Sequence, residues 1–253
     1  MNVIFILTLI LAFLMIIIGG KKGARSFLSL FLNFIVIILT ILFMTDESAN
    51  PIIITLIACI IISSINLFLI NKVNSKTVTA FVATVITISL LLIFIHFVTT
   101  KAMIQGFGEE EIEELSVFSL FIGVDLMKVA TSVIIMSTIG AITDMAISIT
   151  SPMWEIFHHK PKISRKELFT SGLTIGRDIL GSNANTLFFA FFGGYMALLL
   201  WFKDLSYTIG DIANSKIFGA EMLIISFAGI GIALIIPIAS FINAYYLISK
   251  QNK

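Results

Sequence analysis

Long, uninterrupted apolar runs constrain this chain more than any other feature of its sequence. A helix crosses the hydrocarbon core of a bilayer with roughly 20 predominantly apolar residues. About seven segments approach or exceed that length, at residues 3–18, 27–44, 51–70, 77–98, 126–149, 179–202 and 221–248. None of them alternates polar and apolar residues as the strands of a membrane barrel do. The sequence therefore predicts an all-α, polytopic membrane helix bundle, with a single transmembrane domain covering residues 1–253.

The composition excludes the soluble classes of protein. Hydrophobic residues make up 58% of the 253 residues and charged residues only 12%, against about 25% charged residues in a typical soluble domain. A soluble fold of this size could not cover so much apolar surface. The net charge of +1 gives no basic excess for a nucleic-acid partner. The single cysteine, Cys59, excludes a disulfide framework and a cysteine-built metal site. The lipid bilayer is the expected surrounding of this chain.

The distribution of lysine and arginine predicts an orientation in that bilayer. With seven spans, most of the basic residues fall on one side: Lys21, Lys22, Arg25, Lys72, Lys76, Lys160, Lys162, Arg165, Lys166, Lys250 and Lys253. The acidic cluster at 109–114 falls on the other side. Basic loops stay in the cytoplasm, so we expect the N-terminus outside and the C-terminus inside the cell. Residues 115–124 are apolar but too short to span, and an interfacial and a re-entrant element both remain open.

Turn and capping residues predict where the helices begin and end. Gly19–Gly20, Asn50–Pro51 and Ser151–Pro152 all disfavour the continuation of a helix. Residues 164–167 read Ser-Arg-Lys-Glu, which matches a capping box at a helix start. We therefore expect a short helix on the inner surface of the membrane ahead of the span at 179–202.

The fifth and sixth spans differ from the first four because they carry ionisable side chains. Asp144 and Arg177 are both expected near the inner surface, on helices that follow one another in the chain, so we predict an ion pair between them. The helical spacing places Asp178, Ser182 and Asn185 on one face. The candidate substrate or ion path is therefore formed by Asp144, Ser148, Arg177, Asp178, Ser182 and Asn185. A purely structural role, in which these groups lock two helices together, remains the alternative.

Other chemical signals are weak. Glu155, His158 and His159 have the spacing of metal ligands, but the chain has no HExxH motif and we expect no metal site. An interfacial patch of Trp154 and histidine is the simpler interpretation. Phosphate-binding loops, nucleophile elbows and dinucleotide fingerprints do not occur in the sequence, and no nucleophile lies beside a base. We therefore expect neither a cofactor nor enzymatic activity.

Around the polar residues the sequence resembles the YibE/F-like family of bacterial multi-pass membrane proteins. The resemblance rests on Gly-Ala-Ile-Thr-Asp-Met-Ala-Ile-Ser-Ile at 140–149, Ser-Arg-Lys-Glu-Leu-Phe-Thr-Ser-Gly at 164–172, and Ile-Gly-Arg-Asp-Ile at 175–179. It implies a multi-pass cell-membrane protein of the short type, without the extracytoplasmic region that longer relatives carry before their first span. It also implies the hypothesis that the chain associates with a longer YibE/F-like partner. The resemblance implies no particular activity.

Two functions are consistent with these observations. The first is a transporter or permease subunit with a polar site between spans five and six. The second is a non-transporting accessory or scaffold subunit that binds a related membrane protein. A polar face that lines a cavity favours the first function, and one that packs against another helix favours the second.

Overall fold

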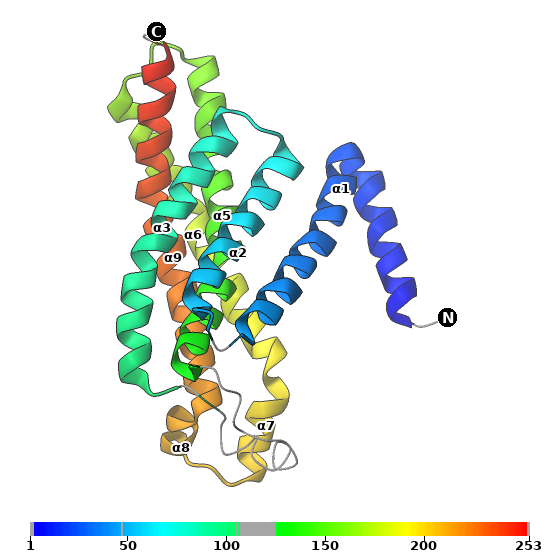
Figure 1. Cartoon of the computed structure of the whole chain (residues 1–253). Coiled ribbons are helices and arrows are strands. Elements are labelled where there is room, and N and C mark those ends of the chain that lie inside the picture. Colours follow the sequence, from blue (N-terminus) through cyan, green and yellow to red (C-terminus); the bar gives the residue numbers. More distant parts are fainter. Residues whose placement is uncertain (1–2, 47, 105, 107–124, 252–253) are drawn as a thin grey trace.

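The protein is a bundle of long helices. The computed structural model describes residues 3–46, 48–104, 106 and 125–251, and every regular element in these ranges is helical (Figure 1). The elements are α1 (Val3–Met44), α2 (Pro51–Ser64), the π-helix η1 (Ile65–Leu69), α3 (Ser75–Ala102), α5 (Leu126–His159), α6 (Arg165–Gly194), α7 (Met196–Asp204), α8 (Ile209–Asn214) and α9 (Lys216–Gln251). The all-α expectation is confirmed. The predicted interfacial or re-entrant element at 115–124 lies outside the described residues.

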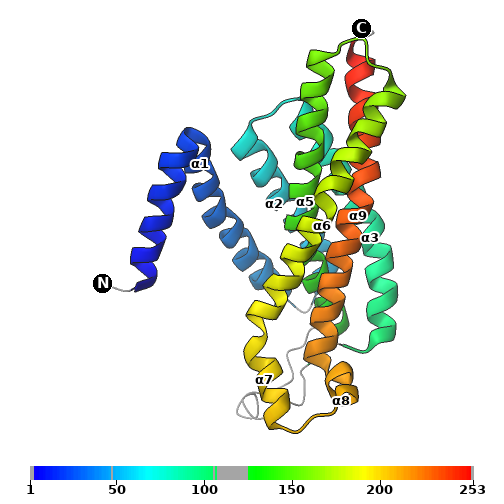
Figure 2. The ribbon, with the colours of Figure 1, turned by 180° about the vertical axis from the view of Figure 1, so that it is seen from behind.

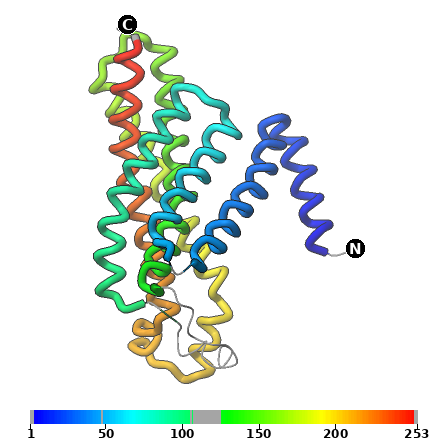
Figure 3. Tube along the Cα trace, in the orientation of Figure 1, coloured from blue at the N-terminus to red at the C-terminus, as the bar shows by residue number. Residues whose placement is uncertain are grey.

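Within the described residues, five helices are long and apolar enough to cross a membrane: α1, α2 with η1, α3, α5 and α9. The pair α6 and α7, bent by 50° at Tyr195, supplies a sixth if it is counted as one span. The segments at 3–18 and 27–44 both lie within α1, whose helical conformation is interrupted at Gly20 with φ 54° and ψ −136°. The chain reverses its direction there, so that the two limbs of α1 form a V (Figure 3). The break predicted at Gly19–Gly20 is therefore confirmed.

Two predicted boundaries are wrong. Pro152 does not end the fifth span, because α5 continues through it to His159. The capping box at Ser164 and Glu167 forms as predicted, with Ser164 N donating to Glu167 Oε2 at 2.9 Å and Glu167 N donating to Ser164 Oγ at 3.2 Å. However, it starts no separate surface helix, since α6 runs unbroken from Arg165 to Gly194.

The core lies where α5 packs against α3, α6 and α9 (Figures 1 and 3). The three helices α3, α5 and α9 are joined by the buried side chain of Asn243. Its Oδ1 accepts from Thr79 Oγ1 at 3.0 Å, and its Nδ2 donates to the carbonyl of Thr150 at 3.1 Å. Glycine allows the close approach of α6 to its neighbours: a Cβ on Gly172 would lie 2.6 Å from Met153 Sδ.

Most of the lysine and arginine side chains lie toward one end of the bundle. The bend of α1, the connections α2–α3 and α5–α6 and the C-terminus all lie at one end, which is the upper end in Figure 1. Basic side chains make cation–π contacts there: Lys76 Nζ lies 5.0 Å from the centre of the Trp154 ring, and Arg165 lies 4.6 Å from that of Tyr245. The connection that carries Asp46, together with α7 and α8, lies at the opposite end. The basic segments predicted to share one side therefore gather at one end, which we call the basic end.

Candidate functional site

Polar side chains from three elements line one groove of about 930 Å³. Its walls are the second limb of α1, the stretch of chain around η1, and the second half of α5. The polar or charged residues that line it are Lys22, Ser26, Ser29, Asn33, Asn66, Asn71, Thr143, Asp144, Ser148, Ser151 and Glu155. These groups come from helices that are otherwise strongly apolar, so the groove is the main polar feature on this side of the bundle.

The wall formed by α1 is a stripe of polar residues. Lys22, Ser26, Ser29 and Asn33 follow the i, i+4, i+7, i+11 spacing that places side chains on one face of a helix. Asn33 Nδ2 donates to Asn66 Oδ1 at 2.7 Å and so ties α1 to η1. π-Helical segments are frequent at functional sites, and this one lies directly against the groove.

The wall formed by α5 holds the carboxylates. Asp144 lies about 27 Å from the start of α5 and about 22 Å from its end, taking 1.5 Å per residue. Asp144 is therefore near the middle of α5 and not near either of its ends. Asp144 is exposed to the groove and has no hydrogen bond or ion pair with any other described residue. Glu155 lies farther along the same wall, toward the basic end.

Two other residues that line the groove carry buried polar atoms without a partner. Thr143 Oγ1 and Asn33 Oδ1 are buried and have no hydrogen-bond partner within the described part of the chain. Pro152 has no N–H, so the carbonyl of Ser148 lacks its usual helical donor. Such atoms also occur outside the groove, at Thr84, Ser132 and Thr150. A buried polar atom without a partner costs about 1–3 kcal/mol, so a ligand or water that reached the two atoms of the groove would stabilise it.

The charge of the groove is negative on balance. Asp144 and Glu155 contribute two carboxylates, and Lys22 contributes one ammonium group. The oxygen atoms of carboxylates, hydroxyls and carbonyls are the ligands that hard cations prefer. The geometry is therefore suited to a small cation more than to an anion.

The predicted site residues are divided by the structure. Asp144 and Ser148 line the groove. Arg177, Asp178, Ser182 and Asn185 lie on the exposed face of α6, outside it. The predicted ion pair between Asp144 and Arg177 does not form; the salt bridge found in the described ranges joins Lys128 and Asp125 at 3.2 Å.

The packing of α6 explains why that prediction was wrong. Gly172 and Gly176 face Met153 of α5 and Ser240 and Ile236 of α9. Arg177 and Asp178 follow these glycines by 100° and 200° around the helix, so they turn away from α5. Because α6 begins at Arg165, both residues also lie farther inside the helix than the sequence suggested.

The groove contains residues that the sequence did not single out, namely Lys22, Ser29, Asn33, Asn66 and Thr143. Most of these residues lie in the first spans, which carry few ionisable groups. Two features of the sequence could have indicated these residues: the helical spacing of the polar residues from 22 to 33, and the presence of Asn33 and Asn66 in two otherwise apolar segments. These features identify a polar face, but they do not say which helix the face meets.

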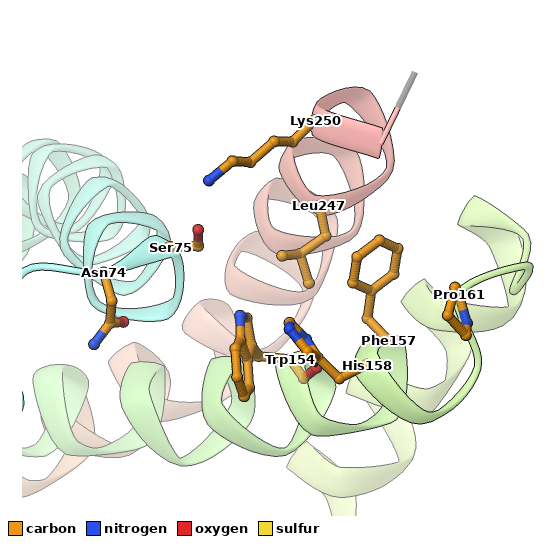
Figure 4. A pocket seen from close by; sticks show the side chains of 8 residues that line it. All are labelled: Asn74, Ser75, Trp154, Phe157, His158, Pro161, Leu247 and Lys250. Atoms are coloured by element: carbon orange, nitrogen blue, oxygen red, sulfur yellow. Dashed lines mark hydrogen bonds between the residues drawn. The ribbon is translucent and has the colours of Figure 1, made fainter. Parts of the chain in front are cut away.

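A second cavity of about 620 Å³ lies at the basic end, between the start of α3 and the ends of α5 and α9 (Figure 4). The rings of Trp154 and His158 contact each other in it, tilted by 32° with their centres 3.7 Å apart, and Lys250 reaches across from α9. Glu155 lines the groove while His158 lines this cavity, so the spacing of metal ligands seen in the sequence does not bring them to one point. In the described ranges, no three His, Cys, Asp or Glu residues are grouped to hold a metal ion.

Comparison with known proteins identifies the family. The model of the YibE/F-like protein family matches residues 7–249, nearly the whole chain. The chain therefore belongs to this family, as the motifs around Asp144 and Arg177 indicated. No curated protein and no solved structure matches it.

Proposed function

We propose that the protein is a transporter or permease subunit that carries a small monovalent cation through the groove formed by α1, η1 and α5. Asp144 holds the cation, or a proton in its place. The single observation that carries the proposal is the position of this carboxylate. It lies halfway along a membrane helix, without a partner, in a groove with unpartnered oxygen acceptors.

Energetics support a ligand at this position. An aspartate at the centre of a membrane helix costs about 2.5–3.5 kcal/mol on insertion scales, and such residues commonly mark ion and proton routes. A bound cation or proton neutralises the carboxylate. Divalent cations are usually held by several carboxylates, whereas the two carboxylates of this groove, Asp144 and Glu155, are about 16 Å apart along α5 by the helical rise. The charge therefore favours a monovalent ion.

The proposed topology has seven crossings, with each limb of α1 as one crossing and the bent pair α6–α7 as another. The N-terminus is then outside and the C-terminus inside the bacterial cytoplasmic membrane. The gathering of Lys22, Lys76, Arg165 and Lys250 at one end supports this orientation through the positive-inside rule. The groove then opens toward the cytoplasm beside Lys22 and Glu155.

Purified protein in liposomes tests the transport proposal. A gradient of Na⁺, K⁺ or Li⁺ is imposed, and the internal pH is followed with a fluorescent dye. Wild type is expected to exchange protons for at least one of these cations, and Asp144→Asn to lose the exchange. Asp204→Asn is the matched control, because it neutralises an exposed aspartate at the far end of the molecule. Equal exchange by wild type and Asp144→Asn, under every gradient tried, would remove Asp144 from the route.

The accessory or scaffold function is a second candidate, and one observation favours it. The exposed polar face of α6 is not used by the transport proposal and is suited to holding chains together. Under this alternative, Asp144→Asn changes neither flux nor ion binding, and variants on α6 reduce assembly. Measuring flux and assembly in the same preparation separates the two functions.

A further inference from the structure

The face of α6 that points away from the bundle is polar over almost three turns. Thr174, Asp178, Gly181 and Asn185 lie on it, flanked by Arg177 and Ser182, and all six residues are exposed. Arg177 lies about 18 Å from the start of α6 at Arg165, by the rise of 1.5 Å per residue. Figure 2 shows α6 on the outer surface of the bundle in the view from behind.

The rest of the described chain does not neutralise this face. Arg177 and Asp178 form no salt bridge with any described residue, and Thr174 Oγ1 bonds only to the carbonyl of Thr170 on its own helix, at 3.1 Å. The opposite face of α6 is used by the bundle, where Leu168, Gly172 and Gly176 are buried. Charged residues that face lipid within a span are rare, because they normally face a protein interior or pair with one another.

The face is complementary to itself. The basic residue Arg177 directly precedes the acidic residue Asp178. When two copies of α6 lie parallel and in register, Arg177 of each copy therefore lies near Asp178 of the other. A twofold axis along the membrane normal gives this arrangement and keeps both copies in the same orientation in the membrane. One turn farther on, Gly181 and Ser182 permit close approach of the backbones. Asp178 and Asn185 are seven residues apart, so each meets its own copy near the axis. The two amides hydrogen-bond there, and the two carboxylates are neutralised by the Arg177 side chains that flank them.

We propose that a second copy of this chain covers the polar face of α6, in a parallel twofold dimer held by reciprocal pairs of Arg177 and Asp178. Opposite charges at an interface fix its register, and like charges in the same place oppose association. The glycines at 172 and 176 are occupied by contacts within the chain, so this dimer uses the other side of the helix.

Charge complementation between two differently tagged copies tests the proposal. Arg177→Asp gives a wholly acidic pair of residues, and Asp178→Arg gives a wholly basic one. Each variant is expected to co-purify with itself about tenfold less than wild type, a change that corresponds to 1.4 kcal/mol. Co-expression of the two variants is expected to restore the wild-type yield. Lys203→Asp and Asp204→Arg are matched controls, since they change an adjacent exposed pair on α7 and are expected to leave association unchanged.

Cysteine cross-linking tests the same contact without changing charge. In a Cys59→Ala background, Asn185→Cys is expected to form a disulfide-linked dimer in the membrane. Ile93→Cys, on the exposed face of α3, is expected to form none. Unchanged self-association of both charge variants would overturn the proposal, and so would a cross-link from Asn185→Cys that joins only a longer YibE/F-like protein. Neither readout depends on transport, so the dimer and the ion route can fail separately.

Discussion

At the scale of single residues, buried hydroxyls and amides in this protein have two distinct roles. Asn243 makes hydrogen bonds to both α3 and α5 from its place in α9. Thr143 is also buried and Asn33 is partly buried, but each leaves a buried oxygen atom without a partner. The first arrangement stabilises the bundle, whereas the second lowers its stability unless a ligand is bound. Mutations at these positions should therefore change stability and binding in different directions.

Replacing Asn243 by leucine is expected to lower the free energy of unfolding by about 1 kcal/mol, which is the usual range for hydrogen bonds between membrane helices. The change removes the bonds to Thr79 and to the carbonyl of Thr150. Thermal unfolding in detergent measures the effect. Asn214→Leu is the control, because Asn214 is exposed on α8. An unchanged midpoint for Asn243→Leu would show that these bonds add nothing to the packing of the three helices.

Replacing Thr143 by valine is expected to have opposite effects on stability and on binding. Valine keeps the shape but removes a buried hydroxyl whose oxygen lacks a partner, so the unliganded protein gains up to about 1 kcal/mol. Affinity for the proposed cation falls by about tenfold, because one oxygen ligand is lost. Thr138→Val is the control: its hydroxyl already donates to the carbonyl of Ile135 at 2.8 Å, so its removal lowers stability and leaves affinity unchanged. The same sign of stability change for both variants would contradict this account.

At the scale of elements, the hairpin of α1 depends on one backbone position. Gly20 has φ 54°, in the left-handed region, and no atom lies within 4 Å of the place where a Cβ would be. A side chain at this position would therefore change stability through the backbone conformation, because it would meet no neighbouring atom. Gly19 has the same open surroundings without the positive φ, and it offers a control at the neighbouring position.

Gly20→Ala is expected to destabilise the reversal of α1 by about 1 kcal/mol, because an alanine in this region is strained. Gly19→Ala is expected to be neutral or stabilising, since alanine favours the helix. Spin labels on the two limbs, at Leu7 and Leu39, report the distance between them. A broadened distance distribution for Gly20→Ala alone is the predicted result. Identical distributions for the two variants would exclude Gly20 as the source of the bend.

The same elements show how far the sequence is informative. The apolar segments, the reversal at Gly20 and the capping box at Ser164 and Glu167 follow from local rules, which act within a few residues. The continuation of α5 through Pro152 does not, because tertiary packing overrides a helix-breaking residue. The start of the sixth span was predicted at residue 179, whereas α6 begins at Arg165. The polar residues between these positions are typical of a protein surface, and the sequence does not show that they belong to a helix that packs against the bundle.

At the scale of the whole molecule, the candidate site depended on which helix faces meet. The sequence predicted that Asp144 and Ser148 share a face that meets α6; both line the groove, but α6 does not. In the structure, glycines direct α6 toward α9, and the polar stripe of α1 lies across the groove from Asp144 instead. Spacing along a helix determines a face, whereas the partner of that face is set by packing over the entire bundle.

The arrangement as a whole places Asp144 in a polar groove, near the middle of α5, with Glu155 farther along the same wall toward the basic end. Labelling with a hydrophobic carbodiimide, followed by mass spectrometry, tests this central claim most directly, because the reagent modifies protonated carboxyl groups in apolar surroundings. At fixed pH, Asp144 is expected to be labelled, and rising Na⁺, K⁺ or Li⁺ is expected to suppress the labelling, more weakly in Thr143→Val. Labelling of Asp144 that none of these cations changes would contradict a cation site in the groove.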